Sequence, residues 1–158
     1  MAQKSIIVNN YLNVFTEEIA GGGITPGMLI ELASTGKVVA HNSAGVTALP
    51  MFAKEDELQG KGINDAYILN DKVQVFFPQR GDQVLGILAD GENVAIGDLL
   101  ESNGEGFLQK HVLGSALVVE APQVIVGVAT EAVDLSDSSA TESSGPLAYE
   151  KRIIVRIY

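Results

Sequence analysis

The chain has 158 residues, 20 acidic and 10 basic side chains, a formal net charge of −10 and no cysteine. This length suits one domain with a substantial core, and the lack of cysteine excludes disulfides and thiolate metal sites. The acidic balance argues against nucleic acid as a partner, because affinity for phosphates comes mainly from Lys and Arg, and it argues equally against anionic membranes. No apolar run is long enough to predict a membrane span, and the first residues lack the pattern of a secretory signal.

Short runs of β-branched and aromatic residues, separated by turn residues, predict a mostly β protein. Apolar residues do not recur with helical spacing over any long segment, whereas Gly, Asn and Asp interrupt the apolar runs repeatedly. This pattern is typical of a single small β-barrel or sandwich domain. In chain order, we expect strands at Ser5–Val8, Met28–Ala33, Lys37–Ala40, Val73–Phe77, Gln83–Ala89, Ala116–Glu120, Gln123–Ala132 and Arg152–Ile157.

Two further segments and three turns complete the prediction. Pro50–Glu57 favours one helical turn, and Asn93–Leu100 favours a strand and a turn. Tight turns are expected where Gly follows a short polar residue, because Gly, Asn and Asp tolerate a positive φ. They occur at Ser34–Gly36, at Asp90-Gly91 and at Ser102–Gly106, and the first of them predicts a hairpin.

By composition the chain divides into three parts. Residues 1–23 form an N-terminal arm that ends in a flexible Ala20–Gly23 link, residues 24–134 form the β core, and residues 135–158 form a Ser-rich loop and a terminal strand. Two hypotheses stay open for the apolar arm, which is either the first strand of its own sheet or a segment that packs on a neighbouring molecule. The terminal strand has similar alternatives, in its own sheet or in a neighbour's.

Residues that usually carry catalysis are present without the patterns that catalysis needs. The two histidines, His41 and His111, lie far apart and lack the spacing of metal ligands. No serine lies in a GxSxG elbow, and Ser115 belongs to an expected strand. A Ser-His-Asp triad is recognised by geometry, so only the fold can reveal one. We therefore expect no catalytic, cofactor-binding or metal-binding residues.

The acidic run Glu55–Glu57 has two interpretations. It is a metal or general-acid site, or, as the flanking Lys54 and Lys61 favour, a solvated loop face. Neither a calcium loop nor a phosphate loop is present, since Gly21–Gly23 is followed by Ile-Thr-Pro and not by Lys-Ser or a helix.

One segment offers a rival interpretation from a different class of protein. Asp71-Lys72-Val73 and the Gly and Val spacing that follows resemble the second half of a lipoyl or biotinyl carrier domain. That resemblance implies an exposed hairpin lysine, which would be Lys72. The preceding half-repeat of such a domain is missing, and the alternative is that Lys72 is an ordinary turn residue before a strand.

A series of small motifs points to another family. In order they are Ile24–Met28, Ala66-Tyr67, Asp71–Val73, Arg80–Asp82, Ile96–Ser102, Gly104–Gly106 and Val126–Asp134. Each motif is weak alone, but their order resembles that of the decoration, or cement, proteins on the heads of tailed bacteriophages. The resemblance spans about residues 24–134 and is carried by a PG strand opener, two GD turns and a terminal V-G-x-A-x-E-A segment.

This resemblance implies a structural virion protein without catalysis or cofactor. It would be made in the host cytoplasm and would add to the outer face of an assembled capsid. Its partners would be the major capsid protein and copies of itself, with a homotrimer expected before a dimer. No residue role is carried over, because the family offers no contact motif that this sequence matches. The alternatives are another head-fibre or tail β-structural protein and, third, the carrier module.

Overall fold

The computed structural model describes residues 5–12, 14–46, 48–112, 124–136 and 151–158. Its elements are short strands and one 3₁₀ helix, so the expected mostly β fold is confirmed. They are β1 Ile7–Asn9, β2 Phe15–Ile19, β3 Ile30–Leu32, β4 Val38–Ala40, β5 Phe52–Lys54, η1 Glu57–Gln59, β6 Lys72–Phe76, β7 Gln83–Ile87, β8 Asn93–Val94, β9 Leu99–Ser102, β10 Leu108–Lys110, β11 Gly127–Ala129, β12 Val133–Asp134 and β13 Arg152–Ile157.

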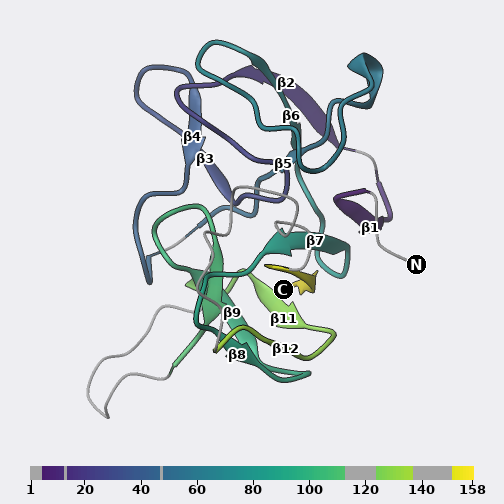
Figure 1. Ribbon diagram of the computed structural model, residues 1–158, viewed down its shortest axis with the longest axis vertical. Coiled ribbons are helices and arrows are strands. Elements are labelled where there is room, and N and C mark those ends of the chain that lie inside the picture. Colours follow the sequence, from purple (N-terminus) through teal and green to yellow (C-terminus); the bar gives the residue numbers. More distant parts are fainter. Residues whose placement is uncertain (1–4, 13, 47, 113–123, 137–150) are drawn as a thin grey trace.

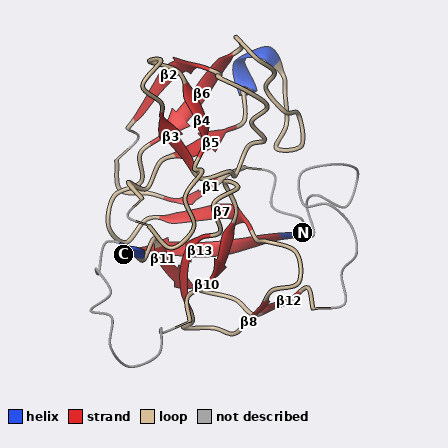
Figure 2. Ribbon diagram, turned by 90° about the vertical axis from the view of Figure 1, so that its left-hand side faces the viewer, coloured by secondary structure: helices blue, strands red, loops and turns tan. Residues whose placement is uncertain are grey.

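The strands gather into two lobes along the long axis of the molecule (Figure 1). The first lobe holds a three-stranded sheet in the order β2-β6-β5 and the β3-β4 hairpin. The second lobe holds a six-stranded sheet in the order β1-β7-β13-β11-β9-β10 and the β12-β8 pair. Every ladder between these strands is antiparallel. Figure 2 shows the two groups of strands one above the other.

Two apolar cores hold the lobes together, because each core contains residues from both lobes. Phe52 and Phe76 belong to strands of the first lobe but pack in the larger core beneath the six-stranded sheet. Ile87 and Phe107 come from the second lobe and pack in the core of the first. Burying such side chains stabilises a fold by about 1.5–3 kcal/mol each. The exchange makes the two lobes a single packing unit.

The six-stranded sheet curls strongly on itself. An isolated parallel bridge joins Leu108 of β10 to Leu88, the residue after β7. The ladder does not continue beyond that bridge, so the described strands form no closed barrel. Of the two architectures that the sequence predicts, the sandwich-like one agrees with the structure.

Both ends of the described chain pair within the molecule. β1 adds to the edge of β7, and β2 forms a five-residue ladder with β6. β13 lies between β7 and β11, with the same bounds that the sequence predicts. The segment Ala20–Gly23 is not a free link, because Ala20 is fully buried and the Gly21 N–H donates to the Val38 carbonyl. A Cβ on Gly21 would meet Val39 at 2.8 Å, which explains the glycine there.

One turn design recurs at the start of four strands. In each turn the backbone N–H of the fourth residue donates to the carbonyl of the first, and the third residue has a positive φ, which favours Gly or Asn. In three of them the fourth residue is Asp, whose carboxylate accepts the N–H of the first residue at 2.8–3.0 Å. The turns are 25–28, 68–71, 79–82 and 95–98, with positive φ at Gly27, Asn70, Gly81 and Gly97.

Several predicted elements differ from the structure. Pro50–Glu57 contains strand β5, and its helical turn begins only at Glu57. Gln123–Ala132 contributes the three residues of β11, and Ala116–Glu120 lies outside the described residues. β2 and β10 were not expected, because neither sequence shows the alternation of a half-buried strand.

Gly106 in the β9-β10 hairpin and Gly91 in the turn between β7 and β8 give a matched pair of tests. Gly106 and Gly91 have φ values of 81° and 82°, so alanine costs about 1 kcal/mol at either from backbone strain. A Cβ on Gly106 would also meet Ala40 Cβ at 2.9 Å and Leu29 O at 3.1 Å. A Cβ on Gly91 would have no atom of the described residues within 4 Å. We expect Gly106→Ala to lose about 2–4 kcal/mol in urea unfolding and Gly91→Ala about 1 kcal/mol. Equal losses would show that the hairpin does not pack against β4 as described.

Candidate functional site

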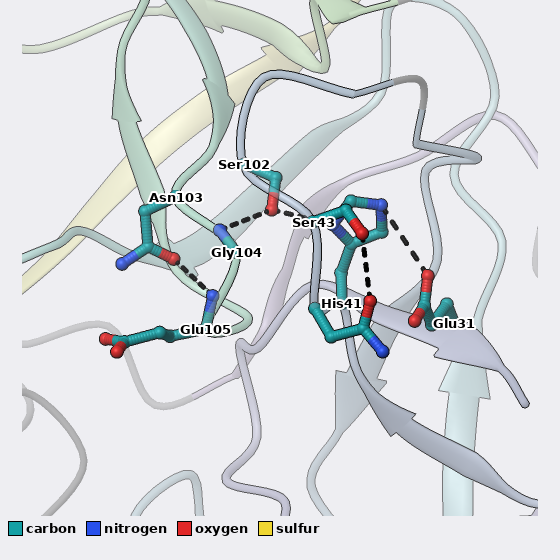
Figure 3. A network of polar contacts seen from close by, with 8 residues as sticks. Glu31, His41, Ser43, Ser102, Asn103, Gly104 and Glu105 are labelled. Carbon is teal, nitrogen blue, oxygen red and sulfur yellow. Dashed lines mark hydrogen bonds and ion pairs between the residues drawn. The ribbon is translucent and has the colours of Figure 1, made fainter.

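A buried polar network joins the two lobes (Figure 3). His41 follows β4, and its Nδ1 lies 2.7 Å from the hydroxyl of Ser102 at the end of β9. The other ring nitrogen, Nε2, lies 3.7 Å from a carboxylate oxygen of Glu31 in β3. No sequence pattern signals this grouping, because the three residues are brought together by the packing of one hairpin on another.

The grouping resembles a Ser-His-acid triad but does not have the access that such chemistry needs. Ser102 is 0% exposed, so no substrate reaches its oxygen. Its hydroxyl oxygen also accepts the backbone N–H of Gly104 at 3.1 Å, which satisfies it locally. A backbone hydrogen bond joins the same two segments, because the Gly106 N–H donates to the carbonyl of His41. The network therefore serves as a joint between the lobes.

His111 occupies a second acidic setting, apart from the first. Its Nδ1 lies 2.5 Å from one oxygen of Glu101, whose other oxygen accepts a hydrogen bond from Gln109. Nearby, the Lys110 ammonium holds the pKa of Asp98 below its usual range. Over the described ranges no group of three potential metal ligands converges. The two histidines thus lie in different places, and neither belongs to a metal cluster among those residues.

Arg152 forms a further joint between the lobes. It begins β13 in the second lobe and is 4% exposed. Its Nη2 donates to the carbonyls of Pro26 and Ile63, and its Nη1 donates to Asn64 Oδ1 at 2.9 Å. A planar guanidinium can reach three acceptors in different directions at once, which a Lys ammonium on a flexible stem does less well.

The acidic run is not the solvated loop face that the sequence favours. Glu55 and Asp56 are buried, and only Glu57 of the three is exposed. Asp56 caps η1 by accepting the Gln59 N–H. Glu55 Oε2 accepts the N–H of Ile6 at 3.1 Å, which ties the residues before β1 to the first lobe. The prediction was wrong because sequence spacing gives no sign of a backbone donor 49 residues away.

A small pocket of about 150 Å³ opens beside this run, on the three-stranded sheet. Strands β2, β5 and β6 contribute its walls, and the chain before and within η1 contributes its rim. Glu55 Oε1 is buried and has no hydrogen-bond partner among the described residues. The lining residues are Phe15, Lys54, Glu55, Asp56, Glu57, Leu58 and Gln74.

Hydrogen bonds fix the walls of the pocket. Tyr67 donates its hydroxyl to the Lys54 carbonyl at 2.6 Å, and burial raises the pKa of Tyr67 to about 12, so the donor stays protonated at neutral pH. In the neighbouring strand β6, Gln74 Nε2 donates to Glu17 at 3.0 Å. Together with the bond from Lys72, this holds the pKa of the Glu17 carboxyl below its usual range. These hydrogen bonds hold the side chains and backbone of the pocket walls in place.

Lys72, the candidate carrier lysine, does not lie at the apex of a hairpin. It is the first residue of β6, opposite Ile19 of β2. Its ammonium lies 3.4 Å from Glu17 and is largely exposed. The turn before it is 68–71, so Lys72 follows the turn and takes part in the ladder.

Large apolar side chains lie exposed on the loops at one end of the first lobe. Lys37 Nζ donates to Asn70 Oδ1 at 2.8 Å, which places the β3-β4 hairpin beside the 68–71 turn. Leu32, Ile68 and Leu69 are each more than half exposed on these neighbouring segments. Apolar groups gathered in this way usually mark contact surfaces.

No protein-family model matches the chain, and no curated protein matches it in sequence. Of the residues that the structure covers, none belongs to a helix long and apolar enough to cross a membrane.

Proposed function

We propose that the protein is a structural component of a tailed-phage virion that binds the outer surface of the capsid and stabilises it, with no catalytic role. The observation that carries the proposal is the ordered series of turn motifs by which the sequence resembles cement proteins. Four turns of one design initiate β3, β6, β7 and β9, and they include the PG and GD members of the series. The proposal thus rests on motifs that shape the body, not on single residues.

The surface is compatible with a protein-binding role. His41 and Ser102 of the polar network are buried inside the molecule, whereas apolar side chains such as Ile68 and Leu69 lie exposed on loops. A body held by two interlocked cores and several polar joints is rigid, which suits a protein that must reinforce its partner. A head-fibre or tail protein would need the same properties and is the second candidate.

We further propose that the protein acts as a homo-oligomer, with a trimer before a dimer. Within the described strands, β2 has β6 as its only ladder neighbour, so its other edge is available for pairing. Open edges are usually covered in stable proteins, and closed symmetry is the common way in which identical chains cover them. The terminal strand does not add to this argument, because β13 lies inside its sheet.

Cosedimentation tests the proposal. The purified protein is mixed with expanded, empty capsids of the phage that encodes it, and bound and free protein are quantified after centrifugation. We expect saturable binding at a fixed ratio to the capsid protein, and a trimeric mass by light scattering. The absence of saturable binding to intact capsids would contradict the proposed function.

A further inference from the structure

The pocket over Glu55 contains an incomplete hydrogen-bonding arrangement. Glu55 is 2% exposed; one of its carboxylate oxygens accepts the Ile6 N–H, and the other has no partner in the described part of the chain. A buried charged oxygen without a donor is costly, and protein structures rarely leave one. A hydrogen-bond donor that reached this oxygen would remove that cost.

The pocket selects that donor by charge. Three acidic residues, Glu55 to Glu57, line it beside one basic residue, Lys54. The Lys54 ammonium lies 3.2 Å from Glu57, at the rim, and so is already engaged with the exposed carboxylate. The remaining negative charge favours a cation, and a cationic donor also makes the stronger, charge-assisted hydrogen bond to a carboxylate.

The volume of the pocket and the apolar residues at its rim limit which donors fit. A pocket of about 150 Å³ is smaller than the usual site for a metabolite. It suits a single long side chain. Phe15 and Leu58, which are 53% and 89% exposed, offer apolar surface on which a methylene stem can lie. Leu58 and Glu57 are surface side chains, so they can change rotamer to admit the head group without loss of core packing.

We propose that this pocket receives a lysine or arginine side chain from the surface of the partner protein, with its head group bound to Glu55. The identity of the partner as the major capsid protein rests on the proposed function, whereas the chemistry of the pocket does not. The same contact places the partner over β2, β5 and β6 of the first lobe.

The experiment uses a small probe first. Nα-acetyl-lysine N-methylamide is titrated into the ¹⁵N-labelled full-length protein, with the norleucine analogue as a control that keeps the stem and lacks the ammonium. We expect saturable amide shifts at residues 54–58 and 74 for the lysine probe and markedly weaker ones for norleucine. The absence of shifts in these residues, or equal shifts with both probes, would overturn the inference.

Substitution then separates charge from folding. Glu55→Gln removes the charge but keeps an oxygen that can accept the Ile6 N–H, so we expect unchanged folding and about tenfold weaker binding of the lysine probe, the effect of losing one charged hydrogen bond. Glu105→Gln is the matched control, since Glu105 is exposed on the β9-β10 hairpin and its change should have no effect. If Glu55→Gln disturbs folding, Phe15→Ala at the exposed rim tests the stem contact and should weaken the binding of both probes.

Two further experiments identify what occupies the pocket. Lys4 lies two residues before Ile6 in the sequence. If the probe binds only after Lys4→Met, the pocket's natural occupant is the chain's own lysine and the inference is wrong. With capsids, binding that is unchanged by Glu55→Gln overturns the inference and leaves the proposed function intact. A wild-type protein that binds the probe but not capsids supports the pocket chemistry and refutes the proposed function.

Discussion

Deletion of residues 2–19 is expected to abolish the cooperative unfolding transition. The deletion removes Ile6, which is fully buried in the larger core, together with the whole β2 ladder on β6. It also leaves Glu55 without the Ile6 N–H. The loss of one buried isoleucine side chain alone costs about 2–5 kcal/mol, and a domain of this kind has about 5–15 kcal/mol in total.

A shorter deletion provides the control for this result. Removing only residues 2–4 keeps Ile6 and the ladders of β1 and β2. Circular dichroism should therefore report a melting temperature close to that of the full chain. The two hypotheses for the N-terminal arm make opposite predictions for the longer deletion. A truncated protein that lacks residues 2–19 and still melts near the native temperature would show that the arm belongs to a partner's surface.

Arg152→Met is expected to destabilise the protein by about 3–5 kcal/mol, because three hydrogen bonds to a charged group are lost at once. Methionine fills much of the volume, so the loss reports on the carbonyls of Pro26 and Ile63 that become unsatisfied, not on a cavity. For a chain of this length the melting temperature should fall by roughly 6–20 °C.

The same strand offers the matched control. Arg156 is exposed four residues along β13, so Arg156→Met should change the unfolding free energy by less than about 0.5 kcal/mol. Arg152→Lys should be intermediate, because one ammonium cannot meet acceptors in the two directions that the guanidinium spans. Equal stability of the Met variants at 152 and 156 would contradict the role of Arg152 as a joint between the lobes.

The parts of the fold that could be predicted from sequence are those with local causes. Arg152–Ile157 is a dense run of β-branched residues, and its bounds are confirmed. The Ser34–Gly36 hairpin is confirmed because Gly36 supplies the positive φ that such a turn requires. Turn chemistry and β propensity act over a few residues, so a short window of sequence contains them.

The parts that could not be predicted depend on distant partners. The β2 sequence, FTEEI, has no alternation because it lies at a sheet edge where both faces are largely exposed. Ala20–Gly23 has the composition of a linker, and only the approach of β4 makes its small residues necessary. In both cases the sequence of the segment does not contain the residues that determine its structure.

The candidate sites show the same division. The spacing around His41 and His111 is visible in short stretches of sequence, whereas their contacts with Ser102 and Glu101 are not. The burial of Glu55 could not be predicted, because its backbone partner lies just before β1 and the pocket walls include β2 and β6. A buried carboxylate in a Lys-flanked acidic run looks the same in sequence as a solvated one.

The central claim is that this body binds the outside of a capsid as a rigid, non-catalytic reinforcement. A cryo-electron microscopy reconstruction of capsids saturated with the protein tests it most directly. The account predicts added density on the outer face, at fixed symmetry positions, into which the two-lobed body fits with its first-lobe pocket against the capsid protein. A saturated sample with no added density, or with density inside the shell or on the tail, would contradict it.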